Sequence, residues 1–259
     1  MINTGKSTRG WHRLECFHEC PQKFAYSELL GLRPKIKKEE LFLGTLVHVA
    51  LAHRYGEILN MPEAIDPIEA MRKEGNGSFI FHRAKDIYNL YDLKWKVEDF
   101  RPIAIEEEFA ININGELFTQ RIDLVANING RICFVDHKTY SRKSIWERRG
   151  QFLGQTVLGK TLVPEKYGLP FGGIWVNEIC TLKPVGSRSF SRRKVEMPNG
   201  LVDSFTKEVA RSYKEMASLV SLDPYSYPRN YSACEGKYGR GCDYWNICCK
   251  GKSVLEEYE

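Results

Sequence analysis

Hydrophobic and polar positions repeat with a helical period toward both ends of the chain, and the middle of the chain has a residue pattern typical of strands. Apolar residues three and four apart predict two short helices over 8–30 and further helices over 40–59, 64–73, 79–97, 144–162 and 202–222. Runs rich in β-branched and aromatic residues predict strands over 103–113, 118–127, 131–138, 173–181 and 187–195. Asn114-Gly115 and Asn129-Gly130 separate the first three strands, and because Asn-Gly favours tight hairpins, we expect an antiparallel meander.

The order of these elements predicts the fold class. Helices, three strands, a helix, two strands and a last helix indicate an α/β fold, with a mixed central β-sheet flanked by helices. We expect one domain over residues 1–259, because this length is sufficient for a large hydrophobic core. Within it we expect a helical N-terminal part (1–100), a core (101–222) and a cysteine-bearing tail (223–259).

Composition narrows the class of protein. Hydrophobic residues make up 42% of the chain and charged residues 27%, which is typical of a globular protein and not of a disordered one. No stretch approaches ~18 consecutive apolar residues, and the chain begins with polar residues, so we expect no membrane span and no secretory signal. These features predict a cytoplasmic protein, and the net charge of +5 favours a polyanionic partner.

Two aspartates and a lysine fall on adjacent predicted strands. Asp123 lies in the second strand of the meander and Asp136 ends the third, so the hairpin between them places the two carboxylates across the ladder. Residues two apart share a face of a strand, and Lys138 therefore projects with Asp136 while His137 points away. Two carboxylates beside an ammonium suit a hard cation such as Mg²⁺ or Mn²⁺. The alternative is a set of solvated residues at a strand end.

The step of thirteen residues from Asp123 to Asp136, followed by Lys138, resembles the nuclease signature of the PD-(D/E)XK superfamily. The closest resemblance is to its RecB-like and Cas4-like branch, in which an upstream helix carries a histidine after a glycine. The segment Gly44-Thr45-Leu46-Val47-His48 matches this feature. The resemblance implies a restriction-endonuclease-like core, in a bacterial, archaeal or phage-infected cell.

The resemblance also implies divalent-metal-dependent hydrolysis of phosphodiester bonds. The ion, Mg²⁺ or Mn²⁺, would be held by His48, Asp123, Asp136 and the backbone carbonyl of His137. The Lys138 ammonium would position the attacking water and stabilise the charge that develops at phosphorus. Gln151 and Gln155 match glutamine positions of the helix after the lysine, and Gln151 would complete the catalytic set by orienting the substrate or Lys138. A glutamate near the metal is also expected, either Glu107 or Glu108.

Cysteines at both ends of the chain suggest a second metal site. The sequence lacks the paired Cys-x₂-Cys knuckles of a zinc ribbon. Cas4-like and AddB-like nucleases have one cysteine near the start and three near the end around a [4Fe–4S] cluster, which would here join the two ends of the chain. The ligands implied by this resemblance are Cys20, Cys234, Cys242 and Cys248. Cys249 or Cys16 could replace one of them, and a Zn²⁺ site or free thiols are alternatives.

Basic and aromatic residues near the lysine motif suggest contacts with DNA. The candidates for phosphate contacts are Arg142, Lys143, Arg148 and Arg149, with a further group at Arg188, Arg192, Arg193 and Lys194. The candidates for stacking on unpaired bases are Trp146, Tyr140 and Tyr244. Cys133 and Cys180 lie in apolar strands and are expected in the core.

These observations favour a DNA nuclease, an exonuclease acting on single-stranded or end-containing DNA. One alternative is a non-catalytic nucleic-acid-binding or assembly subunit with a nuclease fold, and another is an RNA- or structure-specific endonuclease. Similar proteins serve in recombination, repair, replication and CRISPR-type complexes, and protein partners of that kind are expected. A motor would be a separate chain, because the sequence has no Walker A motif.

Overall fold

The computed structural model describes residues 2–35, 39–75, 78–141, 145–235 and 241–259. The chain divides into two compact units. The sheet unit comprises residues 1–7, 38–111 and 119–205, and the cysteine unit comprises residues 8–37, 112–118 and 206–259. The single domain expected over 1–259 stays a prediction.

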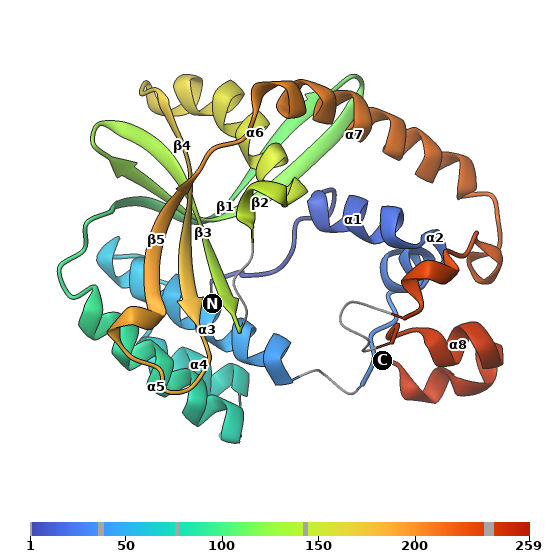
Figure 1. Cartoon of the computed structure of the whole chain (residues 1–259), viewed down its shortest axis with the longest axis horizontal. Helices are drawn as coiled ribbons and strands as arrows, with labels where there is room; N and C mark the ends of the chain where they lie inside the picture. Colours follow the sequence, from blue (N-terminus) through green and yellow to red (C-terminus); the bar gives the residue numbers. More distant parts are fainter. Residues whose placement is uncertain (1, 36–38, 76–77, 142–144, 236–240) are drawn as a thin grey trace. The chain divides into compact units, whose positions relative to one another are not determined.

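A five-stranded sheet with the order β1-β2-β3-β4-β5 organises the sheet unit (Figure 1). The strands are β1 (Arg101–Ile113), β2 (Glu116–Ile128), β3 (Arg131–Tyr140), β4 (Phe171–Cys180) and β5 (Phe190–Val195). β2 and β3 pair antiparallel, β3 and β4 pair parallel, and β4 and β5 pair antiparallel. The predicted α/β fold with a mixed sheet is confirmed.

Both predicted Asn-Gly turns are present. Asn114 and Gly115 have φ angles of 53° and 90°, and Asn129 and Gly130 have φ angles of 53° and 79°. Two successive left-handed residues are typical of the hairpin turn whose twist matches that of the flanking strands. The second turn sets the β2–β3 register, whose last aligned pair is Leu124–Val135, next to the two aspartates.

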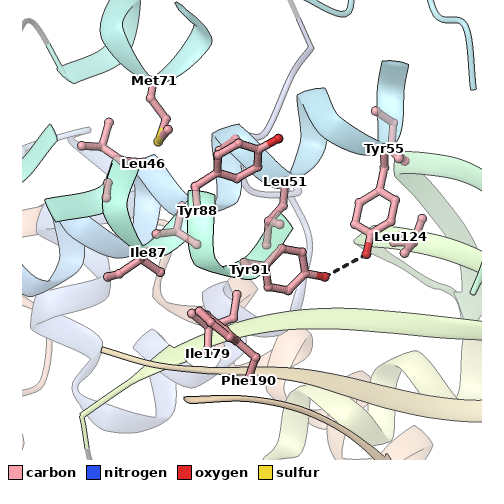
Figure 2. Packing of buried hydrophobic residues seen from close by; sticks show 14 of the residues in the cluster. Leu46, Leu51, Tyr55, Met71, Ile87, Tyr88, Tyr91, Leu124, Ile179 and Phe190 are labelled. Atoms are coloured by element: carbon pink, nitrogen blue, oxygen red, sulfur yellow. Dashed lines mark hydrogen bonds between the residues drawn. The ribbon is translucent and has the colours of Figure 1, made fainter. Parts of the chain in front are cut away.

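Helices pack on both faces of this sheet (Figure 1). The helices of the sheet unit are α3 (Glu39–Ile58), α4 (Pro67–Gly75), α5 (Phe79–Lys94) and α6 (Gly150–Tyr167). Figure 2 shows the face covered by α3, α4 and α5, where Leu46, Met71 and Tyr91 pack in one buried cluster with Ile179 of β4. α6 packs with β4 on the other face, through Phe152. The side chains of successive residues of β3 therefore point to opposite faces of the sheet.

The helix predicted over 144–162 begins and ends later than expected. α6 starts at Gly150 and follows a short 3₁₀ turn over Trp146–Arg148. Trp146 is buried and its indole N–H donates to Glu178 of β4, so this segment folds onto the sheet instead of extending the helix. α6 ends at Tyr167 and is followed by Gly168, whose φ of 64° is typical of a helix C-cap.

The cysteine unit contains short helices and the long helix α7. Its elements are α1 (Trp11–Glu19), α2 (Pro21–Phe24), a π-helix (Ala25–Leu29), most of α7 (Asn199–Leu219), 3₁₀ turns over Pro224–Ser226, Tyr231–Ala233 and Gly251–Glu257, and α8 (Trp245–Lys250). The N–H groups of Arg33 and Glu259 each donate to the other residue's carbonyl at 2.8 Å. Backbone hydrogen bonds therefore join Glu259 to the segment that follows the N-terminal helices within this unit.

Over the described ranges, no helix combines the length and the apolar character needed to span a membrane.

Candidate active site

A close contact between α3 and β3 determines where His48 lies. A Cβ atom built on Gly44 would lie 2.9 Å from the Oγ1 atom of Thr139, a distance that real side chains do not adopt. Glycine therefore allows α3 to approach β3 at this point. About one turn later in α3, the Nδ1 atom of His48 lies 3.6 Å from the Oδ2 atom of Asp123.

Asp136 is buried in the sheet unit, with 7% of its side chain exposed. Its Oδ1 atom accepts hydrogen bonds from Gln151 at 2.9 Å and from Gln155 at 3.2 Å, both on α6. Its Oδ2 atom lies 2.5 Å from the ammonium of Lys138. The expected pairing of Asp136 with Lys138 is present, and two amide groups of α6 fix the orientation of the carboxylate.

Asp123 is held by a backbone donor. Its Oδ2 atom accepts a hydrogen bond of 2.8 Å from the N–H group of His137, and the same oxygen faces His48. Asp123 lies one residue beyond Leu124 and His137 two residues beyond Val135, the last aligned pair of β2 and β3. Asp123 therefore joins the two strands through its side chain beside Asp136.

A third carboxylate, Glu106 of β1, belongs to this group and was not predicted. Burial raises the pKa of Glu106 to about 9, and the negative charges of Asp123 and Asp136 contribute further. Its φ angle of 48° is left-handed, which is uncommon for a residue other than glycine. Because backbone handedness within a run of three glutamates cannot be deduced from residue type, the sequence contained no signal that singled out Glu106.

Glu107 and Glu108, the carboxylates expected near the metal, each pair with another residue. Glu107 pairs with Lys166 and accepts a hydrogen bond from Tyr167, at the end of α6. Glu108 pairs with Arg121 at 3.1 Å. Both carboxylates are therefore engaged with residues outside the predicted site.

The side chain of His137 lies on the opposite face of β3 from Asp136, as expected. Its imidazole stacks on the ring of Tyr55, with 5.6 Å between ring centroids, and its Nδ1 atom is 2.9 Å from the amide nitrogen of Asn177. Complete burial lowers the pKa of His137 to about 3. The imidazole is therefore neutral near pH 7 and acts as part of the core.

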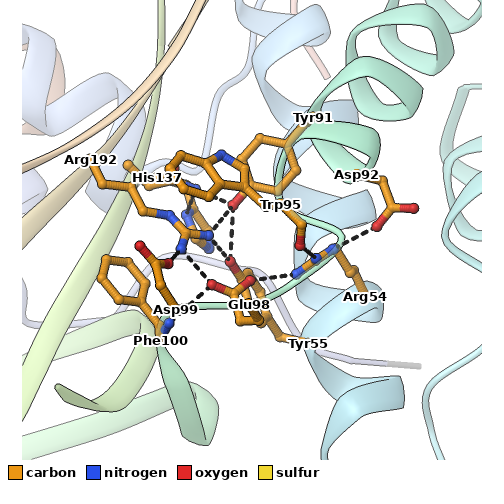
Figure 3. Close-up of polar contacts among 11 residues, drawn as sticks. Arg54, Tyr55, Tyr91, Asp92, Trp95, Glu98, Asp99, Phe100, His137 and Arg192 are labelled. Atoms are coloured by element: carbon orange, nitrogen blue, oxygen red, sulfur yellow. Dashed lines mark hydrogen bonds and ion pairs between the residues drawn. The ribbon is translucent and has the colours of Figure 1, made fainter. Parts of the chain in front are cut away.

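A buried polar network surrounds this histidine (Figure 3). The Tyr91 hydroxyl accepts hydrogen bonds from Asn177 at 2.7 Å and from Arg192 at 3.1 Å, and it lies 2.9 Å from the Tyr55 hydroxyl. Because two donors fill the acceptor positions of Tyr91, its own proton is directed to Tyr55. Arg192 is also paired with Glu98. This network ties α3, α5, β4 and β5 to His137 and lay outside the sequence predictions, because its members are far apart in the chain.

Of the predicted metal ligands, Asp123 lies with His48, and Asp136 lies with Lys138 and the two glutamines. Within the described part of the chain, no three His, Cys, Asp or Glu side chains form a group that could hold a metal ion. The donor set nevertheless suits a hard cation. The negative charges of both aspartates repel a charged Glu106. The Oδ2 atom of Asp136 is buried, and its contact with Lys138 lacks hydrogen-bond geometry.

The four cysteines proposed as cluster ligands line one cavity of about 140 Å³, and all four belong to the cysteine unit. They are Cys20, Cys234, Cys242 and Cys248, and Cys249 lines the same cavity. Cys16 is not in this lining, and its sulfur lies 3.3 Å from the Ser27 hydroxyl. Burial raises the pKa of Cys242 and Cys248, and the nearby Cys20 contributes to both shifts. The cavity thus gathers thiols from distant parts of the chain.

Several predicted DNA contacts are corrected by the structure. Arg192 is buried in an ion pair with Glu98, so it is not available to phosphate. Trp146 is buried against Glu178, and buried Tyr244 donates its hydroxyl to the Leu32 carbonyl, so neither ring is free to stack on a base.

Two of the predicted phosphate contacts stay exposed. Arg148 and Arg149 are exposed just before α6, and the guanidinium of Arg149 lies 5.2 Å from the centre of the Trp146 ring. Arg142 and Lys143 lie outside the described residues. Cys133 is buried, as expected, whereas Cys180 is only half-buried.

Comparison with known proteins supplies independent findings. The PD-(D/E)XK nuclease superfamily matches residues 11–249 of the chain. A solved structure described as "Putative exonuclease" from Eubacterium rectale is similar with a TM-score of 0.55 and 12% identity, over 88% of this chain and 85% of that chain. This likeness shows a common fold. A second solved structure, described as SSO0001, has a TM-score of 0.36 and 16% identity over 88% of this chain and 93% of that chain. No curated protein matches the chain.

Proposed function

Because the chain belongs to the PD-(D/E)XK nuclease superfamily, we propose that it is a divalent-metal-dependent DNA nuclease of the RecB-like and Cas4-like branch. It would hydrolyse phosphodiester bonds as an exonuclease on single-stranded or end-containing DNA. The observation that supports this proposal best is the contact of 2.5 Å between the Lys138 ammonium and the buried carboxylate of Asp136. The pair combines a fixed positive charge with a carboxylate in the order that the superfamily signature requires.

The acidic groups fit a bound Mg²⁺ or Mn²⁺ ion. The residues that would hold it are His48, Asp123, Asp136, Glu106 and the backbone carbonyl of His137. When bound, the ion would polarise the phosphate and lower the pKa of a coordinated water. Burial and, to a smaller extent, repulsion by Asp123 and Asp136 hold the pKa of Glu106 at about 9, and a bound cation would neutralise this repulsion.

The remaining residues would position the reactants. Lys138 keeps 22% of its side chain exposed, so its ammonium can reach a phosphate oxygen and stabilise negative charge there. Gln151 and Gln155 hold Asp136 in one orientation, which directs the other carboxylate oxygen to Lys138. His137 serves through its backbone, since its side chain lies in the core.

The direct test is digestion of DNA labelled at the 5′ or the 3′ end, single- and double-stranded, with Mg²⁺ or Mn²⁺. The purified wild-type protein should degrade DNA from an end, and Asp136→Asn and Lys138→Ala should each reduce the rate by at least about 10³-fold, because both act in the transition state. RNA substrates of the same sequence distinguish a deoxyribonuclease from an RNA-directed enzyme.

Matched controls are Asp86→Asn and Lys85→Ala on α5, neither of which lies in the site. Both should keep wild-type cleavage. Wild-type protein that binds DNA but cleaves neither DNA nor RNA would establish the alternative, a non-catalytic subunit with a nuclease fold. Cleavage by Lys138→Ala at the wild-type rate would refute the assigned role of the lysine.

We also propose that the cysteine cavity holds a [4Fe–4S] cluster on Cys20, Cys234, Cys242 and Cys248. Four thiols from both ends of the chain around one cavity support this proposal, since four thiolates are the ligands of such clusters. The cluster would add to the backbone hydrogen bonds that already join Arg33 to Glu259. Zn²⁺ is the alternative ligand, because tetrahedral thiolate sites also bind it.

Anaerobic purification followed by iron, sulfide and zinc analysis tests the cluster. We expect iron and sulfide in equal amounts and a broad absorbance at about 400 nm. Cys20→Ser should remove both, whereas Cys16→Ser, whose sulfur is not in the cavity lining, should retain them. Zinc without iron in the wild-type protein would overturn the cluster and leave the cavity as a zinc site.

A further inference from the structure

Two large aromatic side chains are exposed together at the rim of the cysteine cavity. Tyr231 is 72% exposed and Trp245 is 51% exposed, yet both belong to the lining of the same cavity. Single exposed apolar residues are common on protein surfaces, but neighbouring exposed rings mark a surface that contacts another molecule.

A second hollow adjoins this rim. It has a volume of about 380 Å³ and is lined by Tyr225, Ser226, Tyr227, Arg229 and Tyr231. Arg229 and Tyr231 also line the cysteine cavity, so these two residues form the wall between the hollows. The interaction with the Tyr231 hydroxyl raises the pKa of Arg229, so the two side chains lie close to each other.

The charge of this surface favours an anion. Among the described residues that line the two hollows, Lys23 and Arg229 are cationic and none is acidic. Lys23 is paired with Glu19 at 2.9 Å, so the charge offered to a ligand comes mainly from Arg229. Nearby, the ammonium of Lys252 lies 4.7 Å from the centre of the Tyr225 ring. A ligand that offers both flat apolar rings and negative charges at short intervals matches this surface, and an unpaired nucleic-acid strand has both.

We propose that Tyr231, Trp245 and Arg229 form a binding platform for single-stranded nucleic acid. Bases of the strand stack on the two rings, and a phosphate group binds the guanidinium. This inference rests on the proposed function and specifies its substrate, since an unpaired strand would be held on the cysteine unit while phosphodiester chemistry belongs to the sheet unit.

The test is the affinity of a fluorescein-labelled oligo-deoxythymidine strand, measured by anisotropy in Mg²⁺-free buffer with Lys138→Ala protein, which prevents cleavage. A second substitution in this protein, Trp245→Ala or Tyr231→Ala, should weaken binding by about 5- to 100-fold, as expected for loss of a stacked base. The matched control is Phe79→Ala on α5, which removes a ring that is 73% exposed on the sheet unit. It should leave the affinity unchanged.

A strand of abasic residues with the same number of phosphates separates stacking from charge. Trp245→Ala should not change its affinity, whereas Arg229→Ala should weaken both strands and reduce the slope of log affinity against log salt by about one. Equal losses for Trp245→Ala and Phe79→Ala, or no loss for any variant, would overturn the platform.

Iron content and visible absorbance of the same samples test a different role for the rings. If Trp245→Ala lowers the metal content but not the affinity for the strand, the rings shield the cavity and the platform is wrong. A wild-type protein that cleaves DNA while all variants bind normally refutes the platform alone. A wild-type protein that binds the strand as predicted but does not cleave refutes only the proposed nuclease activity.

Discussion

The N–H group of His137 donates a hydrogen bond of 2.8 Å to the Oδ2 atom of Asp123. His137 stands between Asp136 and Lys138 on β3, so the backbone of this strand fixes the position of the carboxylate on β2. The side chain of His137 points to the other face, where Tyr55 and Asn177 hold it. Groups on the far face of the sheet therefore support the site through the strand itself.

Tyr91→Phe should impair the candidate active site, although Tyr91 does not contact it. The Tyr91 hydroxyl accepts from Asn177 and Arg192, and its loss leaves one N–H of each of these buried side chains without an acceptor. We expect a loss of stability of about 1–3 kcal/mol and, because Asn177, which also contacts His137, then loses one of its anchors, a lower kcat with little change in KM. Urea unfolding and steady-state cleavage of DNA measure the two effects.

The matched control is Tyr88→Phe, one turn earlier on the same helix. The hydroxyl of Tyr88 has no hydrogen-bond partner among the described residues, so kcat and stability should stay close to those of the wild type. A Tyr91→Phe protein that loses stability but keeps the wild-type kcat would show that the network serves only the fold.

Gly44→Ala should displace α3 from β3. The added Cβ would lie 2.9 Å from the Thr139 Oγ1 atom, and the overlap should cost about 1–3 kcal/mol of unfolding free energy. The shift would also move His48 away from Asp123. Thr139→Ala removes the clashing oxygen, so the double variant should recover most of the lost stability. The two single variants and the double variant form a double-mutant cycle. Non-additive changes in the free energy of unfolding would establish the contact, and additive changes would contradict it.

Glu106→Gln should stabilise the metal-free protein, and more so at high pH. The folded protein keeps the proton of Glu106 up to about pH 9, whereas the ordinary pKa of glutamate is 4.5. The folded state therefore binds more protons between these values, and stability falls as the pH rises through this window. Glutamine has no proton to lose. The increase in Tm caused by the substitution should be larger at pH 8 than at pH 5 in EDTA, and an equal increase at both would contradict the raised pKa.

Lys138→Arg should not restore the activity lost in Lys138→Ala. The ammonium fits 2.5 Å from Asp136, whereas a guanidinium is planar and larger and would be held away from the same position. We expect cleavage rates at least about 10²-fold below the wild type. As a control, Lys85→Arg on α5 should keep the wild-type rate, and full activity of Lys138→Arg would show that any cation at this position is sufficient.

Much of the fold followed from local sequence patterns. Periodicity predicted α3 and the strands within a few residues, because an amphipathic period reflects which side of an element is buried. The Asn-Gly turns set the β2–β3 register, which carries Asp123 and Asp136 to adjacent positions. The start of α6 was predicted wrongly, because the burial of Trp146 against Glu178 is a tertiary contact.

The sequence by itself determined which strand carries Asp136 and Lys138 and that both share one face, since these properties depend on spacing along one strand. Only the tertiary structure decided that Glu106 and not Glu107 or Glu108 joins the aspartates, because a left-handed residue redirects that part of β1. It also decided that Arg192 is buried with Glu98. Burial and charge pairing depend on residues distant in the chain, and no local pattern records which of them will meet.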